Sequence, residues 1–297
     1  MNANYRSGFV SIIGRPNVGK STLLNQIMGE KLVIISNKPQ TTRNTIRCIF
    51  TQKDFQMVFI DTPGMHKPKN KLGEYMVNAA KQTLNEVDVI LFLVDESMNI
   101  GSGDQYIMEI LKEVKTPVLL IINKMDLLTK DELLEKIAIY KDIEGISDII
   151  PISARNSENV SELIKIISDK LPLGPQYFPE DMIIDQPERM IVAELVREKA
   201  LQLLQQEVPH GIATEVTSMK ERKGKNLVDI EVNIYCEKSR HKGIIIGKQG
   251  TMLKEIGKRA RRDIESLLGI RVNLQLWVKV KSDWRNKKRE LKDLGYQ

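Results

Sequence analysis

The sequence of 297 residues contains only two cysteines, few aromatic residues and no long hydrophobic run. Cys48 and Cys236 are too far apart to suggest a disulfide framework or a cysteine metal site, which favours a reducing, intracellular compartment. No stretch approaches the roughly 18 apolar residues of a membrane span. The first residues also lack the apolar core of a secretory signal. We therefore expect a cytoplasmic protein that does not span a membrane.

Positive charge is concentrated at the carboxyl-terminal end of the chain. The formal net charge is +6, and residues 220–297 hold 21 Lys or Arg against 10 Asp or Glu, whereas residues 1–172 hold 21 of each. Such a concentration attracts polyanions, namely RNA, DNA or anionic lipid. The alternative is a solvated basic face that only keeps the protein in solution.

The first part of the chain alternates short apolar runs with stretches of helical apolar spacing. The apolar runs, read as strands covered on both faces, are residues 9–14, 56–61, 87–95, 116–124 and 148–154. The helical stretches are residues 21–28, 75–85, 104–114, 133–140 and 160–171. This alternation predicts an α/β fold with a mainly parallel sheet. Residues 45–50 and 56–60 are separated by a short polar turn and predict an antiparallel hairpin at its edge, which makes the sheet mixed.

Four prolines and a glycine in residues 171–187 indicate a linker. We predict a first domain over residues 1–172, a linker over 173–188 and a smaller α+β domain over 189–297. The second domain begins with a predicted helix at 189–206. It continues with strands at 213–220 and 226–236, a glycine-punctuated stretch at 242–250, a helix at 251–268 and a strand at 271–280.

A glycine-rich phosphate loop lies between the first predicted strand and the first predicted helix. Residues 14–21, GRPNVGKS, match the pattern G-x-x-x-x-G-K-[ST], in which backbone N–H groups and the helix N-terminus surround phosphate oxygens. Lys20 is expected to reach the β- and γ-phosphates, and the Ser21 hydroxyl to ligate Mg²⁺. The predicted nucleotide-binding residues here are Gly14, Arg15, Pro16, Asn17, Val18, Gly19, Lys20, Ser21 and Thr22.

The sequence Asn123-Lys124-Met125-Asp126 follows the strand at 116–124 and predicts which base is bound. The carboxylate of Asp126 can accept two hydrogen bonds from guanine, whereas adenine offers no donor there and would leave a carboxylate unpaired. Asn123 and Lys124 would support this loop. Ser153 and Ala154 can cover the guanine edge through backbone N–H groups.

Two further segments are expected to respond to the third phosphate. In Asp61-Thr62-Pro63-Gly64, the carboxylate of Asp61 would bind Mg²⁺ through water, and the Gly64 N–H can bond the γ-phosphate. In residues 39–43, PQTTR, the hydroxyl of Thr42 can complete the Mg²⁺ shell only when that phosphate is present. We therefore assign catalytic roles to Lys20, Thr42 and Gly64, and expect residues 36–45 and 61–75 to be switch segments.

These five elements, in this order, resemble the guanine-nucleotide-binding set of translation-factor-like GTPases. The resemblance implies GTP and GDP as ligands, Mg²⁺ as cofactor and GTP hydrolysis as activity. Met65 stands where Ras-like switches have a glutamine, so we expect slow intrinsic hydrolysis that depends on a partner. Asn17 resembles the asparagine that helps to bind a stimulating K⁺ in some of these proteins. Alternatively, Asn17 only tolerates a tight turn.

A second constellation, Gly247-Lys248-Gln249-Gly250, follows the apolar residues 244–246 and precedes a basic helix. Such a loop can approach a sugar–phosphate backbone closely, and apolar neighbours can form a groove for unstacked bases. By itself it is equally typical of a helix-capping turn, but its position in the strand and helix order and the basic charge favour RNA. The predicted RNA-binding residues are Ile246, Gly247, Lys248, Gln249, Gly250, Lys254, Lys258, Arg259 and Arg262. Arg261 lies on the same basic helix.

The order of elements in the second domain resembles the type II KH fold, and the whole chain resembles the Era family of bacterial GTPases. The segments QTTR and IIIGKQG carry this resemblance most specifically. It implies binding to 16S rRNA near its 3′ end during assembly of the small ribosomal subunit, and loose association with the inner face of the cell membrane. We expect a monomer that does not bind DNA.

Two alternative functions stay open. One is an RNA-binding scaffold or chaperone with incidental GTPase activity. The other is a membrane-associated regulatory GTPase with a lipid-binding basic tail. The two tryptophans are candidates for stacking on RNA bases. We expect Trp277 in the core. Trp284 either contacts RNA or packs as an exposed anchor against the domain surface.

Overall fold

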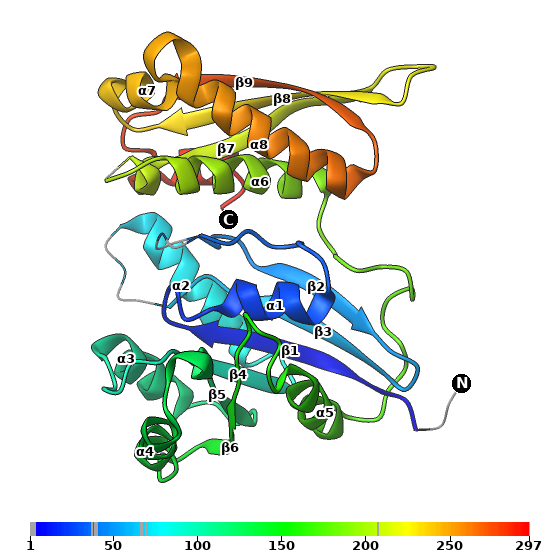
Figure 1. The fold of residues 1–297 in the computed structure, drawn as a ribbon, viewed down its shortest axis with the longest axis vertical. Helices are drawn as coiled ribbons and strands as arrows, with labels where there is room; N and C mark the ends of the chain where they lie inside the picture. The colour runs from blue at the N-terminus through cyan, green and yellow to red at the C-terminus, as the bar shows by residue number, and fades with distance from the viewer. Residues whose placement is uncertain are drawn as a thin grey trace. The chain divides into compact units, whose positions relative to one another are not determined.

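The computed structural model describes residues 4–36, 38, 41–65, 68, 70–206 and 208–296 (Figure 1). The chain forms two compact units. The first comprises Met1–Val33, Thr42–Lys69 and Gly73–Asp185, and the second Ile34–Thr41, Asn70–Leu72 and Gln186–Gln297. Pro39 and Gln40 of the predicted switch segment lie outside the described residues. No helix in the described part of the chain is both long and apolar enough to cross a bilayer.

The first unit is built on a six-stranded sheet in the order β2-β3-β1-β4-β5-β6. The strands are β1 (Arg6–Gly14), β2 (Ile46–Thr51), β3 (Phe55–Asp61), β4 (Val89–Val94), β5 (Val118–Ile122) and β6 (Ile146–Pro151). Strand β2 is antiparallel to β3, and the other neighbours are parallel. The predicted α/β fold with a mixed, mainly parallel sheet is confirmed.

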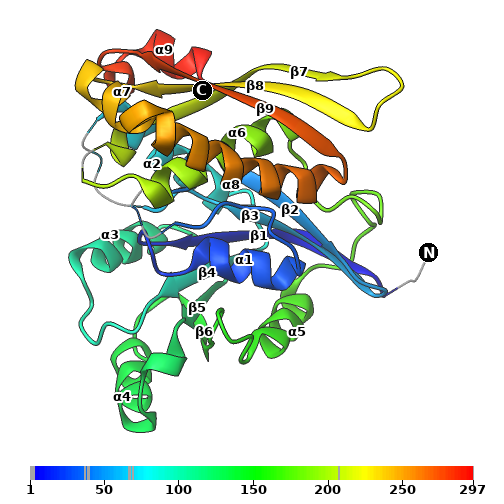
Figure 2. The same ribbon diagram turned by 45° about the horizontal axis from the view of Figure 1, so that its top comes forward.

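Helices cover both faces of this sheet (Figures 1 and 2). One core contains residues of α1 (Lys20–Met28) and α5 (Val160–Lys170), and the other contains residues of α2 (Lys71–Leu84), α3 (Ser102–Leu111) and α4 (Lys130–Tyr140). Successive strand residues point to opposite faces, so in β4 Leu91 lies in the first core and Ile90 in the second. Both are fully buried, which is why the strands appear as unbroken apolar runs.

The proline-rich segment after α5 is bonded to the edge of the first unit. The Gln56 side chain accepts hydrogen bonds from the backbone N–H groups of Tyr177 and Phe178, at 2.8 and 3.0 Å. Farther along, Ile49 N–H donates to the Ile183 carbonyl at 2.9 Å. The chain is therefore attached to this sheet almost as far as Asp185, where the first unit ends.

The second unit contains a three-stranded sheet in the order β7-β8-β9, with β7 and β8 antiparallel and β8 and β9 parallel. Its elements are α6 (Glu188–Leu203), β7 (Ala213–Glu221), β8 (Leu227–Cys236), α7 (Ser239–Ile246), α8 (Thr251–Leu268), β9 (Arg271–Val280) and α9 (Lys288–Asp293). The resemblance to the type II KH fold implies two helices between β8 and β9, but the sequence pattern locates only one of them, at 251–268. Helix α7 lies before the GKQG loop. It was not predicted because it is short and buries only two residues, His241 and Ile245, which are one turn apart and give no clear apolar spacing.

The two tryptophans lie where we did not expect them. Trp277 in β9 is 56% exposed, so the prediction of a core position was wrong. Its neighbour Val278 takes the buried position, as the alternation of a strand requires. Trp284 is fully buried, stacks on Tyr296 with ring centroids 5.9 Å apart, and donates from Nε1 to the Gly211 carbonyl at 3.0 Å. Trp284 is therefore a core residue of the second unit, and both expectations for it, RNA contact and an exposed anchor, were wrong.

Candidate nucleotide site and RNA groove

The phosphate loop joins β1 to α1, and its backbone demands glycine at two positions. A Cβ at Gly14 would lie 2.5 Å from the Leu93 carbonyl oxygen, and one at Gly19 would lie 2.2 Å from the Asn123 side-chain nitrogen. Both residues also have positive φ, 153° and 101°, which L side chains rarely adopt. Any other residue at these two positions would therefore displace the surrounding atoms and strain the loop.

Lys20, the first residue of α1, lies inside this loop. Its ammonium donates to the carbonyl oxygens of Gly14 and Arg15 at 3.0 and 2.9 Å. The side chain is buried, and desolvation lowers the pKa of Lys20 to about 8 although Asp61 acts in the opposite direction. A desolvated ammonium at this position gains strongly from a phosphate oxygen that would replace its lost water.

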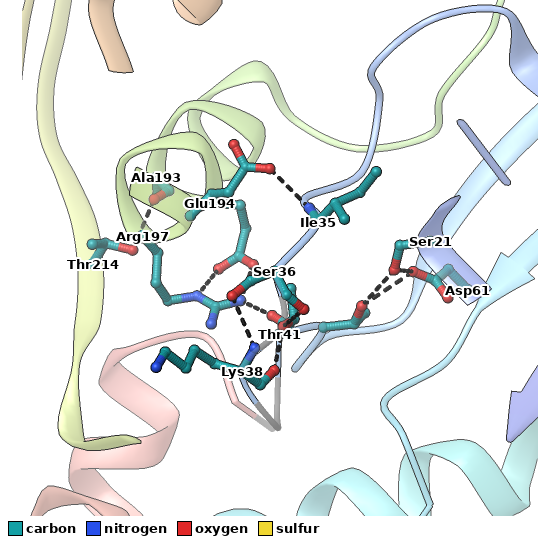
Figure 3. Close-up of polar contacts among 12 residues, drawn as sticks. Ser21, Ile35, Ser36, Lys38, Thr41, Asp61, Ala193, Glu194, Arg197 and Thr214 are labelled. Atoms are coloured by element: carbon teal, nitrogen blue, oxygen red, sulfur yellow. Dashed lines mark hydrogen bonds and ion pairs between the residues drawn. The ribbon is translucent and has the colours of Figure 1, made fainter. Parts of the chain in front are cut away.

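Three oxygen-bearing side chains, from the residue after Lys20 and from two other segments, converge at one point, and Figure 3 shows Ser21 and Asp61 among them. The hydroxyls of Ser21 and Thr42 are 3.2 Å apart, and they donate to Asp61 Oδ2 at 3.1 and 3.2 Å. The other carboxylate oxygen, Asp61 Oδ1, is buried and has no hydrogen-bond partner among the residues that the structure describes. Burial raises the pKa of Asp61 to about 6. Hydroxyl and carboxylate oxygens are ligands that Mg²⁺ prefers, and a cation would satisfy the unpaired oxygen, so these residues fit the expected metal.

The third motif lies directly against the phosphate loop. Thr62 is buried and donates to the Ile12 carbonyl at 2.8 Å, and a Cβ at Gly64 would lie 3.1 Å from the backbone nitrogen of Pro16. Pro63 is buried between them. Met65 is also fully buried, and its N–H donates to the Gly14 carbonyl at 3.2 Å. A buried thioether offers no group that could orient an attacking water.

Asn123 joins the base-recognition loop to two other parts of the site. Its side-chain nitrogen donates to the Val18 carbonyl at 2.8 Å, and its side-chain oxygen accepts from the Ala154 N–H at 3.0 Å. The Ser153 hydroxyl accepts from the Asn156 N–H at 3.2 Å and so fixes the neighbouring turn. The structure thereby brings the phosphate loop, the NKMD segment and Ser153-Ala154 together.

The other two members of the NKMD segment differ in exposure. Lys124 is half-buried, has a φ of 63° and pairs with Glu96 at 2.9 Å. Asp126 is exposed in a short 3-10 turn, Met125–Leu127. A carboxylate exposed in this way is available to a base.

Arg15 adds a feature that sequence reasoning missed. Its guanidinium pairs with Asp104 of α3 and with Asp95 at the end of β4, at 2.8 and 2.9 Å. The side chain is thus engaged by two carboxylates, and it is the carbonyl of Arg15 that contacts Lys20. Asp95 directly follows a buried strand, where the ligand loops of open α/β sheets lie, but this position does not indicate which cation pairs with it.

In the second unit, the GKQG loop connects α7 to α8. Gly247 and Gly250 have φ values of 72° and 78°, and a Cβ at Gly247 would lie 2.7 Å from the Cβ of Met252. Lys248 and Gln249 are exposed, and Ile246 is half-buried at the end of α7. The loop therefore presents its two polar residues on a glycine backbone, as a clamp on a nucleic-acid backbone requires.

A groove begins at this loop and runs between α8 and β9. It is lined by Gly250, Leu253, Lys254, Gly257, Lys258, Arg261, Leu274 and Leu276. The floor is apolar and three cations lie along it, a combination suited to unstacked bases beside a phosphate backbone. Three of the predicted RNA-binding residues, Gly250, Lys254 and Lys258, line the groove.

Arg261 was left out of the predicted RNA-binding set, although it lines the groove together with Lys254 and Lys258. The spacing of these three residues, four and three apart, places them on one helix face and could have identified Arg261. Arg259 is rotated away from this face and pairs with Glu255 at 2.6 Å. Arg262 is exposed on α8 outside the groove lining.

Comparison with known families and curated proteins shows clear relatives. Residues 9–124 match a family described as a 50S ribosome-binding GTPase, and residues 207–285 match the KH domain family. GTPase Era of Alkaliphilus metalliredigens (strain QYMF) is 61% identical over 294 residues, which cover 99% of this chain and all of that protein. GTPase Era of Clostridioides difficile (strain 630) is 58% identical over 98% of this chain and 99% of that protein.

Two solved structures are similar over the whole chain. A crystal structure of Era with MgGDPNP and nucleotides 1506–1542 of 16S ribosomal RNA has a TM-score of 0.95 at 43% identity. It matches over 98% of this chain and 99% of that chain. A variant of Aquifex aeolicus Era bound to GDP and AlF₄⁻ has a TM-score of 0.94, with the same identity and coverage.

Proposed function

The chain belongs to the Era family of GTPases, and from this premise we propose that it binds 16S rRNA near its 3′ end in a GTP-dependent manner during small-subunit assembly. The observation that carries the proposal is the cluster of Ser21, Thr42 and Asp61 oxygens beside the buried ammonium of Lys20. The groove of the second unit supplies the matching RNA surface.

Each motif has a distinct task in this proposal. Lys20 binds the β- and γ-phosphates, and Gly64 donates its N–H to the γ-phosphate. Asp126 accepts from the ring N–H and the amine of guanine. Ser21 and Thr42 would hold Mg²⁺ directly and Asp61 through water, and the bound metal would neutralise charge that develops on the phosphates. Because Met65 is buried and has no acid–base group, hydrolysis stays slow until a partner or a cation helps to position water.

GTP can change RNA binding only if the protein binds RNA with different affinity in its two nucleotide states. Thr42 is the residue most directly sensitive to the third phosphate, because its hydroxyl already stands beside Ser21 and Asp61. We expect residues 36–45 and 61–75 to transmit this difference, although His66, Lys67 and Lys69 lie outside the described residues.

The decisive experiment measures affinities of the purified full chain for GTP, ATP and xanthosine triphosphate. We expect a large preference for GTP in the wild type. Asp126→Asn replaces one acceptor by a donor, which matches the ring N–H and carbonyl of xanthine, so the preference should move to xanthosine triphosphate. Equal binding of GTP and ATP by the wild type would overturn the proposed function. Lys20→Ala should abolish nucleotide binding and leave RNA binding by the second unit.

The scaffold alternative is separated from the switch by RNA affinity. A switch binds a 16S 3′-end oligonucleotide differently with GDPNP and with GDP, and RNA changes its hydrolysis rate. A scaffold binds the oligonucleotide with the same affinity in both nucleotide states, and it hydrolyses GTP at the same rate with and without RNA.

We propose a cytoplasmic location with the ribosomal subunits, together with loose association with the inner membrane face. The basic tail offers limited support for the membrane, because Arg285 pairs with Glu237 at 2.6 Å and Lys287 donates to the Ser282 carbonyl. Pelleting with anionic vesicles, with and without residues 285–297, tests this association.

A further inference from the structure

The segment Ile34–Thr41 belongs to the second unit, whereas the next residue, Thr42, belongs to the first unit and contacts Ser21 and Asp61. The peptide bond between Thr41 and Thr42 therefore joins the predicted metal site directly to the RNA-binding unit. Any group that fixes this peptide also constrains Thr42, because the six atoms of a peptide unit are planar.

Helix α6 supplies such groups (Figure 3). The guanidinium of Arg197 donates to the carbonyl oxygen of Thr41, which is part of the peptide that carries the Thr42 N–H. On the same helix, Glu198 Oε1 accepts from the Ile35 N–H at 2.8 Å, and Gln202 donates to the Ile35 carbonyl at 3.2 Å. Glu198 and Gln202 are four residues apart and so lie on one face. Helix α6 therefore holds the segment at both ends.

The segment between these two ends is itself constrained. The Thr41 hydroxyl donates to the carbonyl oxygen of Lys38 at 2.7 Å, and it lies 3.2 Å from the carbonyl oxygen of Ser36. The Ser36 hydroxyl accepts from the Lys38 N–H at 3.1 Å. These hydrogen bonds join Ser36, Lys38 and Thr41, so a displacement of one of these three residues is passed to the other two.

The residues of α6 are held in place by buried ion pairs. Arg197 and Glu198 are both 0% exposed. Arg197 pairs with Glu194, and Glu198 pairs with Lys199 at 2.7 Å, while Lys199 also pairs with Asp263 of α8 at 2.6 Å. Buried charges with several fixed partners keep one geometry, because leaving any of them unpaired is costly. The hydrogen-bonding groups aimed at residues 35 and 41 are therefore preorganised.

We propose that Arg197 and Glu198 are positioning residues of the GTP site. By holding the backbone at Ile35 and Thr41, they set whether the Thr42 hydroxyl stands beside Ser21 and Asp61. This rests on the proposed function, in which Thr42 completes the Mg²⁺ shell only with the third phosphate. The RNA-binding unit thus contributes to discrimination between GTP and GDP through the backbone of Ile35 and Thr41.

The test uses the full chain with Arg197→Met and Glu198→Gln, and measures affinity for GDPNP and for GDP in Mg²⁺. We expect GDPNP to bind about tenfold more weakly in each variant, the size expected for a hydrogen bond to a charged group. GDP affinity should not change, because Thr42 acts only with the third phosphate. Hydrogen exchange of the Ile35 amide should also become faster in both variants.

Two controls separate positioning from general destabilisation. Glu237→Gln removes a carboxylate of the same unit that pairs with Arg285 at 2.6 Å and should leave the GDPNP-to-GDP ratio unchanged. In a Thr42→Ala background, Arg197→Met should add no further loss, because the two residues act through one contact. Gln202→Ala, which removes a hydrogen bond to the Ile35 carbonyl, should show a smaller effect of the same sign. If Arg197→Met and Glu198→Gln, which change buried residues, fold poorly, Gln202→Ala still tests the proposal.

A ratio of affinities that stays at the wild-type value in Arg197→Met, Glu198→Gln and Gln202→Ala would overturn the proposal. If Arg197→Met weakens GDPNP binding as much in the Thr42→Ala background as in the wild type, the proposal is overturned too. Failure of the wild type to bind guanine nucleotides at all is a different result, because it removes the proposed function itself.

Discussion

Asn123 donates a 2.8 Å hydrogen bond to the carbonyl oxygen of Val18, a residue of the phosphate loop. Because the same side chain accepts from the Ala154 N–H, one carboxamide fixes the distance between the phosphate-binding and base-binding parts of the site. Asn123 is 2% exposed, so both bonds are made away from bulk water.

Asn123→Ala should therefore weaken GTP and GDP binding equally. Leaving the buried Val18 carbonyl and Ala154 N–H unsatisfied costs about 1–3 kcal/mol each, so we expect both dissociation constants to rise at least tenfold in calorimetric titrations. Asn156→Ala, which changes an exposed amide of the same region, is the matched control. Loss of GTP binding alone, with GDP binding retained, would contradict a role shared by both nucleotides.

Nucleotide affinity should depend on pH on the alkaline side because of Lys20. Burial lowers the pKa of Lys20 to about 8. Above that pH the side chain is neutral, so binding a polyphosphate requires uptake of a proton, and the GDP dissociation constant should rise with pH, approaching tenfold per unit. Titrations at pH 8.5 in buffers of different ionisation enthalpy should reveal this uptake. A constant affinity from pH 7 to 9 without proton uptake would refute it.

Asp61 should make the effect of Mg²⁺ on GDPNP affinity depend on pH on the acid side. Burial raises its pKa to about 6, so below pH 6 the carboxyl is protonated and Mg²⁺ must displace that proton. The enhancement of GDPNP affinity by Mg²⁺ should therefore be constant well above pH 6 and decline as the pH falls below 6. A Mg²⁺ enhancement that persists unchanged at pH 5 would show that this carboxylate takes no part in metal binding.

Much of the nucleotide site could be predicted because its chemistry is local. The conformations of Gly14 and Gly19 depend on nearby backbone, and a loop of this glycine and lysine spacing between a buried strand and a helix is typical of a phosphate site. Which face a strand residue takes also follows from alternation. Trp277 shows the limit of that reasoning, because a large aromatic residue occupies the outward position of β9.

Contacts between distant segments could not be predicted. Nothing in the sequence near Arg15 indicates that its guanidinium pairs with Asp95 and Asp104, because tertiary packing decides which carboxylates lie beside it. Likewise, Arg197 reaches the Thr41 carbonyl across 156 residues of chain. Charged residues in a helix usually indicate a solvated face, and only the structure shows Arg197 buried.

The two interpretations of Asn17 can be separated by experiment. Asn17 has a φ of 68°, a left-handed conformation that asparagine tolerates better than most residues, so its backbone alone would justify its presence. Asn17→Gly keeps this conformation and removes the carboxamide. If the carboxamide binds K⁺, hydrolysis by the wild type should be faster in K⁺ than in Na⁺, and Asn17→Gly should lose that difference.

Steady-state phosphate release in KCl and in NaCl measures both rates. Retention of a K⁺ effect in Asn17→Gly would assign Asn17 to the turn alone. Equal rates in the two salts for the wild type would remove the K⁺ hypothesis altogether. GDP affinity of the variant, measured in parallel, should stay near the wild-type value and so exclude a distorted loop.

The two neighbouring arginines of α8 offer a matched comparison for RNA binding. Arg261 lines the groove, whereas Arg259 is turned away and neutralised by Glu255. Arg261→Ala should weaken binding of a single-stranded 16S 3′-end oligonucleotide, and it should reduce the slope of log affinity against log salt by about 0.7, the value for one phosphate contact on a single strand. Arg259→Ala should change both quantities much less. Fluorescence anisotropy across a series of KCl concentrations measures affinity and slope together. Equal losses in the two variants would mean that the helix attracts RNA through its total charge and not through the groove.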